Sequence, residues 1–475
     1  MEKFDQIIED IANYVLKYEV KSNLAIDTAY YCLLDSIGCA LEALSYKECT
    51  KLITSLSDES TLNTGARVIG TKYKLDLINS TFCNGALIRW LDFNDTWLAS
   101  EWGHPSDNFA AILSVSEWIS TNNVKQNKKP FMIKDVLSAA VKAYEIQGVI
   151  ALENSFNAVG LDHVILVKLA SAAVTCLLMG LSYEQTLNAI SLVFVDGQAL
   201  RTYRHAPNTG SRKSWAAGDA SSRGVKLALI AKTGEMGYPS ALTAPKWGFN
   251  DVSFKGNSIK LSQDYASYVI ENILFKVSFP AEFHAQTAVE CAMILHEKVK
   301  NRLQEVKLIT IRTHSSAMRI IDKKGPLKNP ADRDHCIQYM VAIPLIYGRL
   351  IALDYEEDVA SNKIIDELRA KMICIEDEQF SKDYLDLNKR SIANGITIEF
   401  NNGDLLDEVV IEYPIGHIRR REEGIPLLMD KFKKNLNRVF TLDQQNKIMT
   451  MVTNKEVFLN TSVNDFMNIL CEGFK

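Results

Sequence analysis

The stretch DHVILVKLASAAVTCLLMGLSYEQ, residues 162–185, marks the boundary between two consecutive helices. Asp162 is a capping residue placed directly before a long apolar run, and Gly180 follows that run as a residue that commonly ends helices. Ser182 and Gln185 then have the spacing of a capping box, which predicts that the next helix starts at once. The stretch therefore predicts one helix directly after another, with no strand between them.

Helical periodicity continues on both sides of this stretch. Apolar residues at intervals of three and four predict further helices, and a proline among capping residues at 104–107 leads into one of them. These helices cover residues 4–16, 29–44, 109–119 and 136–152, the last interrupted by Gly148. The chain returns to the same pattern from Pro426 onwards and can pack back on the first helices.

After about residue 270 the helical pattern gives way to short runs of β-branched residues. They predict strands at Val306–Thr313, Lys371–Ile375, Gly395–Phe400 and Glu408–Tyr413, with helices between them at 281–298 and 336–353. The residues Asn-Asn-Gly-Asp at 401–404 form a hairpin turn signal. We therefore predict an α+β domain after a large helical one.

The composition is that of an ordinary soluble protein. The 53 Lys and Arg against 58 Asp and Glu give a net charge of −5, which disfavours general binding of nucleic acid. The longest nearly apolar stretch, around 169–181, is too short to cross a membrane, so we expect no membrane partner. The N-terminus lacks the basic and apolar regions of a signal peptide, and we predict a cytoplasmic protein.

The nine cysteines are scattered through mostly apolar context, and no two are separated by only two residues. This spacing predicts free thiols in a reducing compartment. It offers no support for a zinc site or an iron–sulfur cluster, and we expect no metal and no cofactor.

Two of the eight histidines, His104 and His163, stand at the starts of predicted helices. A helix start favours a neutral imidazole that can act as a base, although a capping or core histidine is the plainer interpretation. Asp92 and Thr96 are four residues apart, so a helix would place both on one face. The alternative is a polar helix end exposed to solvent.

The sequence RTYRHAPNTGSRK, residues 201–213, is the densest basic segment of this acidic protein. It suits a ligand with several carboxylate or phosphate groups, whereas a solvated loop is the alternative. No glycine-rich phosphate loop occurs, which disfavours a nucleotide. The candidate side chains in this segment are Arg201, Arg204, His205, Arg212 and Lys213.

Two residues of the predicted α+β domain also have side chains that can transfer a proton or bind a ligand. His284 lies near the start of a helix that FPAEFH opens, and Tyr339 lies near the start of an apolar helix. A tyrosine phenol can donate a proton, but a buried tyrosine with one structural hydrogen bond is the commoner case.

Long contiguous motifs resemble the MmgE/PrpD family over nearly the whole chain. They are RWLDFNDTWLASEWGHPSDN at 89–108, ENSFNAVGLDHVILVK at 153–168, VDGQALRTYRHAPNTGSRKSWAAGDA at 195–220, AKTGEMGYPSALT at 231–243 and FPAEFHAQTAVE at 279–290. The resemblance implies a mainly α fold: a large all-helical domain formed by both chain ends, residues 1–272 and 419–475, with a smaller inserted α+β lid domain, residues 273–418. It also implies an active site in the cleft between the domains, and a homodimer.

The resemblance implies a hydro-lyase, and the motifs at 100–108 and 201–215 favour its dehydratase branch. That branch eliminates water from the tricarboxylate 2-methylcitrate to give 2-methyl-cis-aconitate, a step of the methylcitrate cycle in propionate catabolism, and citrate is a further candidate substrate. The nearest alternative is cis-aconitate decarboxylation or another polycarboxylate lyase reaction. A non-catalytic helical protein that holds an anion on residues 201–213 is the alternative from another class.

The family pattern also implies roles for single residues. Losing water requires a base for a carbon-bound proton and an acid for the departing hydroxide, and we hypothesise that His163 or Asp92 is the base and that His104 or Tyr339 delivers the proton. The spacing within FPAEFHAQ leaves open whether His284 or Glu282 reaches the substrate. The remaining residues predicted to bind substrate are Thr96, Arg204, His205, Arg212 and Lys213.

Overall fold

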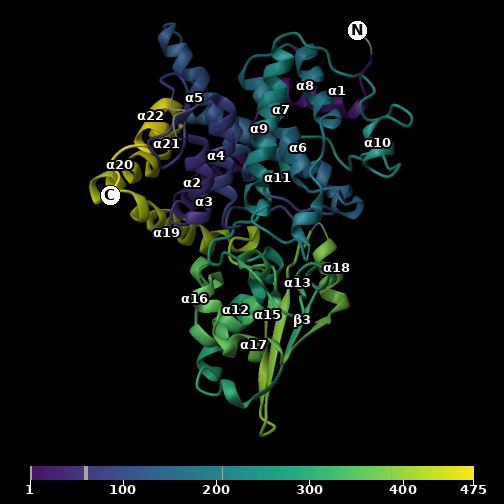
Figure 1. Cartoon of the computed structure of the whole chain (residues 1–475), viewed down its shortest axis with the longest axis vertical. Coiled ribbons are helices and arrows are strands. Elements are labelled where there is room, and N and C mark those ends of the chain that lie inside the picture. The colour runs from purple at the N-terminus through teal and green to yellow at the C-terminus, as the bar shows by residue number, and fades with distance from the viewer. Residues whose placement is uncertain (1–2, 58–61, 206, 387) are drawn as a thin grey trace. The chain divides into compact units, whose positions relative to one another are not determined.

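The computed structural model describes residues 3–57, 62–205, 207–386 and 388–475, and it is mainly helical with a small mixed sheet (Figure 1). The chain divides into two compact units. The helical unit comprises Met1–His205, Arg212–Leu274 and Leu428–Lys475, and the mixed unit comprises Phe275–Leu427 with a short segment ahead of Arg212. The domain boundaries expected from the sequence remain predictions.

The helical unit contains both ends of the chain. Its longer helices are α1 (Gln6–Lys17), α2 (Asn23–Ala43), α3 (Lys47–Ser57), α4 (Leu77–Arg89), α5 (Phe109–Lys125), α6 (Ile133–Glu153), α7 (Val164–Leu178), α8 (Tyr183–Val195), α9 (Arg212–Lys232) and α20 (Leu442–Thr453). Helix α19 (Arg421–Val439) begins in the mixed unit and ends in the helical unit.

The capping signals of the opening stretch are confirmed. The Ser182 hydroxyl accepts from the Gln185 amide at 3.1 Å, and the Gln185 side chain accepts from the Ser182 amide at 3.0 Å. Gly180 has φ +64°, a left-handed conformation that often ends helices and that glycine adopts without steric strain. Helix α7 begins one residue later than predicted, with His163 at its N-cap, and the Asp162 carboxylate accepts from the Val164 amide at 3.2 Å.

Two glycines allow the helices that carry candidate site residues to approach closely. A Cβ on Gly85 of α4 would lie 2.5 Å from the Gly218 Cα of α9, and a Cβ on Gly218 would lie 2.5 Å from the Phe82 carbonyl oxygen. Because real Cβ atoms do not approach backbone this closely, the α4–α9 crossing requires glycine at both positions. The crossing fixes Arg89, the last residue of α4, relative to α9.

Two local predictions for this unit were wrong. Helix α6 runs unbroken through Gly148, because the missing side chain makes room for Val269, whose Cγ1 would lie 2.4 Å from an added Cβ. Asp92 and Thr96 lie in no helix: α4 ends at Arg89, Asp92 has φ 49°, and Thr96 forms an isolated β-bridge with Leu274.

Helix α2 is a longer apolar segment than the stretch 169–181 that the sequence interpretation took as the longest. Among the described residues α2 alone is long and apolar enough to cross a membrane, but 78% of its apolar window is buried within the protein. On this helix Asp35 pairs with Lys431 of α19 at 2.7 Å, and the Tyr30 hydroxyl donates to the Val452 carbonyl at 2.8 Å. Such burial and pairing are typical of a core helix that the C-terminal helices cover.

The mixed unit is built on a four-stranded sheet in the order β4-β3-β5-β6. Its strands are β3 (Val306–Thr313), β4 (Met372–Glu376), β5 (Asn394–Phe400) and β6 (Leu405–Ile411), with β3 and β4 parallel and the other pairs antiparallel. All four predicted strands are confirmed; β3 has the predicted ends, and the ends of the other three are shifted. Helices α12 (Gln286–Val299) and α15 (Ile337–Tyr347) share the apolar core of the sheet. Helix α15 ends earlier than predicted because Gly348 has φ +65°.

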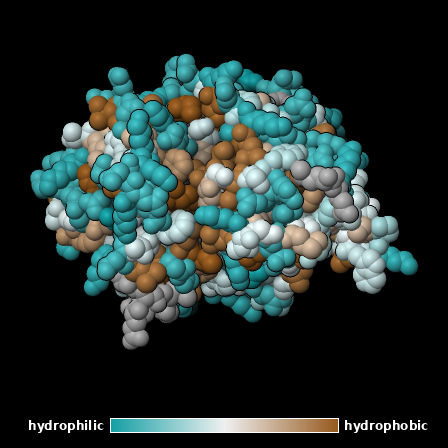
Figure 2. Space-filling model, turned by 90° about the horizontal axis from the view of Figure 1, so that it is seen from above, coloured by the Kyte–Doolittle hydropathy of each residue, from teal (hydrophilic) through white to brown (hydrophobic). Residues whose placement is uncertain are grey.

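Hydrophobic side chains also reach the surface. On the face in Figure 2 they form a broken central band bordered by hydrophilic side chains. In the helical unit the largest exposed apolar side chain is Trp247, 84% exposed, and Leu200 and Val252 are also more than half exposed.

Candidate active site

Arg89 organises the first cluster of candidate residues, which belongs to the helical unit. Its guanidinium places Nη1 2.8 Å from Asp92 Oδ1 and Nη2 2.8 Å from His104 Nε2. All three residues are at least 95% buried. The left-handed backbone at Asp92 turns the chain directly after α4, so that the carboxylate reaches back to a guanidinium three residues earlier.

The neighbours of His104 define its tautomer. Nδ1 lies 2.6 Å from the Asp95 carbonyl oxygen, which can only accept, so Nδ1 carries the hydrogen. Nε2 faces the Arg89 guanidinium, which can only donate, so Nε2 accepts. Thr96 lies beside this site, with its hydroxyl 3.4 Å from His104 Nδ1. The hydrogen bonds therefore assign a neutral imidazole to His104.

His163 lies edge-on to His104, with ring centroids 5.7 Å apart. It is 2% exposed, and neither ring nitrogen has a hydrogen-bond partner among the residues that the structure describes. Burial, aided by Arg204, Arg201 and Arg89, lowers its pKa to about 3 although Asp162 opposes the shift. His163 is therefore neutral near pH 7, and its unprotonated nitrogen can accept a proton, although a pKa of about 3 makes it a weaker base than one whose pKa lies near the working pH.

A buried ion pair stands next to His163. Arg204 contacts both oxygens of Asp162, closely through Nε and at 3.3 Å from Nη2 to Oδ1, and Arg201 Nη1 lies 3.8 Å from Oδ2. Burial alone would raise the pKa of Asp162, but Arg204, His163 and Arg201 hold it below its usual range. Asp162 therefore stays ionised and neutralises part of the charge that the basic segment supplies.

Three further carboxyl groups are completely buried around these residues: Asp95, Glu101 and Asp107. Burial raises their pKa values to about 6, about 7 and about 7, although their hydrogen bonds and the nearby arginines oppose the shift. Asp95 accepts from the Tyr144 and Ser106 hydroxyls at 2.5 and 2.6 Å. These carboxyls can exchange protons near neutral pH, and the sequence interpretation overlooked them.

Several cations of the basic segment, residues 201–213, are already paired with acids of the protein. Arg204 is engaged by Asp162, and His205 is exposed at the end of a short turn. Arg212 pairs with Asp219 at 2.9 Å and stacks over the Trp215 ring, 4.4 Å from its centroid. Buried and neighbouring acids thus pair with Arg201, Arg204 and Arg212, and the role of the segment in substrate binding stays a prediction.

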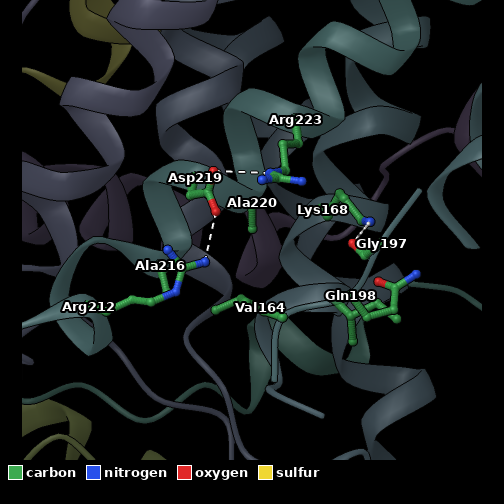
Figure 3. Close-up of a pocket in the computed structure, with 11 residues that line it drawn as sticks. Val164, Lys168, Gly197, Gln198, Arg212, Ala216, Asp219, Ala220 and Arg223 are labelled. Carbon is green, nitrogen blue, oxygen red and sulfur yellow. Dashed lines mark hydrogen bonds and ion pairs between the residues drawn. The ribbon is translucent and has the colours of Figure 1, made fainter. Parts of the chain in front are cut away.

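Arg212 lines a separate pocket of about 210 Å³ between α7 and α9, which Figure 3 shows. In that view Arg212 and Arg223 both point to Asp219, and the Lys168 amine points to the Gly197 carbonyl oxygen at 3.2 Å. Lys213, the next residue of α9, is 5% exposed and is buried in the helical unit.

The mixed unit contains a second buried cluster. Glu282 Oε1 lies 2.7 Å from His284 Nδ1, and His284 Nε2 lies 3.1 Å from the Tyr384 hydroxyl. The ring of His314 stacks on Tyr384 at 4.7 Å, and both of its nitrogens lack hydrogen-bond partners among the described residues. Burial and His284 lower the pKa of His314. Glu282 and His284, the two alternative candidates for contact with the substrate, are hydrogen-bonded to each other and therefore lie at the same place.

Tyr339 is the remaining predicted residue of the mixed unit. Its hydroxyl donates to the Asp354 carbonyl oxygen at 2.6 Å inside the core. Burial raises the pKa of this phenol above its usual range. The sequence interpretation missed Lys276, which is 1% exposed and whose charge helps to lower the pKa of Glu282 against its burial. A lysine within the apolar run ILFKVSF was the available signal.

The structure thus brings together Asp92, Thr96 and His104, and places His163 beside His104. Buried histidines with unused nitrogens, next to carboxyls of shifted pKa, are typical of sites that transfer protons.

Comparisons with known proteins place the chain in a family. The MmgE/PrpD N-terminal domain matches residues 9–262, and the MmgE/PrpD C-terminal domain matches residues 279–456. The chain belongs to the MmgE/PrpD family, as its motifs implied.

Relatives match nearly the full length. The 2-methylcitrate dehydratase of Escherichia coli strain K12 is 59% identical over 470 residues, and that of Cupriavidus necator is 57% identical over 468 residues. Each comparison covers 98% of this chain and 97% of the relative. A probable 2-methylcitrate dehydratase of Saccharomyces cerevisiae is 54% identical over 480 residues, covering 99% of this chain and 93% of the relative.

Proposed function

We propose that the protein is a 2-methylcitrate dehydratase, a hydro-lyase that converts 2-methylcitrate to 2-methyl-cis-aconitate in propionate catabolism. The identity to relatives of that name supports the substrate. The observation that carries the chemistry is His163, a buried neutral imidazole with two unused nitrogens next to a second histidine.

His163 is the base in this proposal. The proton to be removed is on a carbon next to a carboxylate, whose negative charge makes it only weakly acidic. A cation beside that carboxylate lowers the barrier because it stabilises the charge that develops in the transition state. Lys213 is assigned this role, with Thr96 as a hydrogen-bonding group for the substrate.

His104 delivers the proton to the departing hydroxide. In the resting site Nε2 is unprotonated and accepts from Arg89, so His104 must first take up a proton from solvent at Nε2 in place of that hydrogen bond. Asp92 Oδ1, 3.8 Å from this nitrogen and held by Arg89, then stabilises the charged ring. Tyr339 is the weaker candidate because its hydroxyl is already donated to a backbone carbonyl.

Cofactor-free catalysis and a cytoplasmic homodimer complete the proposal. All nine cysteines are free, and seven of them are buried. The exposed Trp247, Leu200 and Val252 are apolar surface of the kind that subunit interfaces cover. Size-exclusion chromatography with light scattering tests the dimer, and dialysis against a chelator followed by addition of iron tests the cofactor-free reaction.

A substrate panel with two variants tests the activity. We expect ultraviolet absorbance of the unsaturated product from 2-methylcitrate, and no release of carbon dioxide from cis-aconitate. His163→Ala and His104→Ala should each lower kcat by roughly 10²–10⁴-fold with the thermal midpoint nearly unchanged. His296→Ala, at a histidine of the mixed unit that belongs to neither cluster and lies 3.1 Å from the Leu345 carbonyl oxygen, is the matched control. Near-normal turnover in His163→Ala would remove the proposed base.

A further inference from the structure

A cavity of about 880 Å³ lies in the helical unit, away from the histidine cluster. Its walls come from the β1–β2 ribbon (Ala66–Arg67 and Lys74–Leu75), the end of α5, and the segment that leads into α22 (Val463–Ile469). Lys125 is the last residue of α5, sixteen residues beyond Phe109, so at 1.5 Å per residue it lies about 24 Å along the helix from the end next to His104. The cavity therefore cannot share a ligand with His104.

Three cations line this cavity: Arg67, Lys74 and Lys125. Arg67 and Lys74 are directly opposite each other in the β1–β2 ladder, where like charges destabilise the pairing. Burial, together with the charges of Arg67 and Lys125, lowers the pKa of Lys74, although the charge of Glu117 opposes the shift. The folded protein therefore holds the Arg67 and Lys74 side chains together although their charges repel each other.

Only one of the three cations forms an ion pair among the described residues, and Lys74 feels the charge of Glu117 without such a contact. Arg67 pairs closely with the fully buried Glu117 and donates to Asn468 at 2.9 Å. Neither Lys74 nor Lys125 has an ion-pair partner among the residues that the structure describes. The exposed Asp465, which accepts from the Ser462 hydroxyl, is the acid in the lining.

The remaining lining is polar enough to hold a charged ligand. Thr121, Thr461 and Ser462 contribute hydroxyls, and Asn464 donates to the Thr121 hydroxyl at 2.8 Å while its buried side-chain oxygen has no partner among the described residues. The volume lies in the range of sites that bind small molecules.

We propose that this cavity is a binding site for a small polyanion that carries two or more carboxylate or phosphate groups. Lys74 and Lys125 bind separate anionic groups of the ligand, and the hydroxyls of the opposite wall complete its coordination. The ligand relieves the repulsion between Arg67 and Lys74 because it adds negative charge to that of Glu117. This site is independent of the proposed lyase activity.

Acetylation of lysines by an N-hydroxysuccinimide ester, read residue by residue by mass spectrometry, tests the site on the full chain. The probes are citrate for the carboxylate class and inorganic pyrophosphate for the phosphate class, each against sodium chloride of equal ionic strength. A probe at about ten times its Kd leaves roughly a tenth of sites empty, so acetylation of Lys74 and Lys125 should fall roughly tenfold. Lys128 and Lys129, outside the lining, are internal controls.

Protection by citrate alone assigns a carboxylate ligand, and protection by pyrophosphate alone assigns a phosphate ligand. Lys74→Met should abolish the protection of Lys125, whereas Lys128→Met should leave it intact. Equal protection by sodium chloride, no protection by either probe, or unchanged protection of Lys125 in Lys74→Met would overturn the proposal. An anion bound elsewhere leaves the rates at these two lysines unchanged, so the proposed lyase site does not affect the readout.

Discussion

Replacement of Arg204 by methionine should raise the pKa of His163. Arg204 Nη2 and His163 Nδ1 contact the same oxygen, Asp162 Oδ1, at 3.3 and 3.4 Å. The two nitrogens are thus no more than about 7 Å apart, and unit charges at that distance interact by about 2.4 kcal/mol at an effective dielectric constant of 20. Loss of the guanidinium should therefore raise the pKa of His163 by about 1.7 units, since one unit corresponds to 1.36 kcal/mol.

The assay is NMR of histidine labelled with ¹³C at Cε1, in which the eight histidines give few signals and His163→Ala assigns one of them. In the wild type the His163 signal should not titrate between pH 5 and pH 8, because its pKa is about 3. In Arg204→Met the signal should begin to shift at the acid end of this range. Arg204→Lys keeps the charge and is the control. An unmoved signal in Arg204→Met, or an equal shift in both variants, would refute the reasoning.

Three further predictions concern stability and the proton donor. Gly148→Ala should cost about 1–3 kcal/mol from overpacking, read as a lower urea midpoint, and adding Val269→Ala should restore most of it; no rescue would contradict the contact. Tyr339→Phe should lower stability by roughly 1–3 kcal/mol because a buried carbonyl loses its donor, with kcat within about tenfold of the wild type; a loss of ~10²-fold or more would make Tyr339 the proton donor. Asp107 binds its proton more tightly in the folded state, with a pKa of about 7, so the stability it contributes declines as pH rises from about 4 to 7. The urea midpoint of Asp107→Asn should therefore fall less steeply between pH 5 and pH 8 than that of the wild type, and equal slopes would exclude Asp107 as the titrating group.

Elements with complete local signals were predictable from the sequence. The Ser182 capping box and Gly180 define the boundary between α7 and α8 through contacts within a few residues, so no distant partner was needed. Gly148 gave the opposite result. In isolation a glycine weakens a helix, but here a residue more than one hundred positions later fills the space it leaves. Helix boundaries were therefore predictable where the determinant is local, and wrong where tertiary packing decides.

The site divides in the same way. The positions of His104 and His163 at helix starts followed from local sequence, whereas their protonation depends on Arg89 and on an Arg204–Asp162 pair that spans 42 residues. A sequence gives the sign of each charge but not its partner. For that reason the pairing of Arg204 with Asp162 could not be predicted from the basic segment itself.

Lys74 and Lys125, which have no ion-pair partner among the described residues, come together with Arg67 at a position that the sequence does not mark. Arg67 and Lys74 become neighbours only because the β1–β2 ribbon pairs them, and Lys125 joins them from the far end of α5. A run of basic residues in the sequence can lose its free charge in the folded protein because buried acids pair with it. Folding can also bring together cations that are far apart in the sequence. An anion-binding site is therefore better sought where like charges are held together without a partner than where basic residues are frequent.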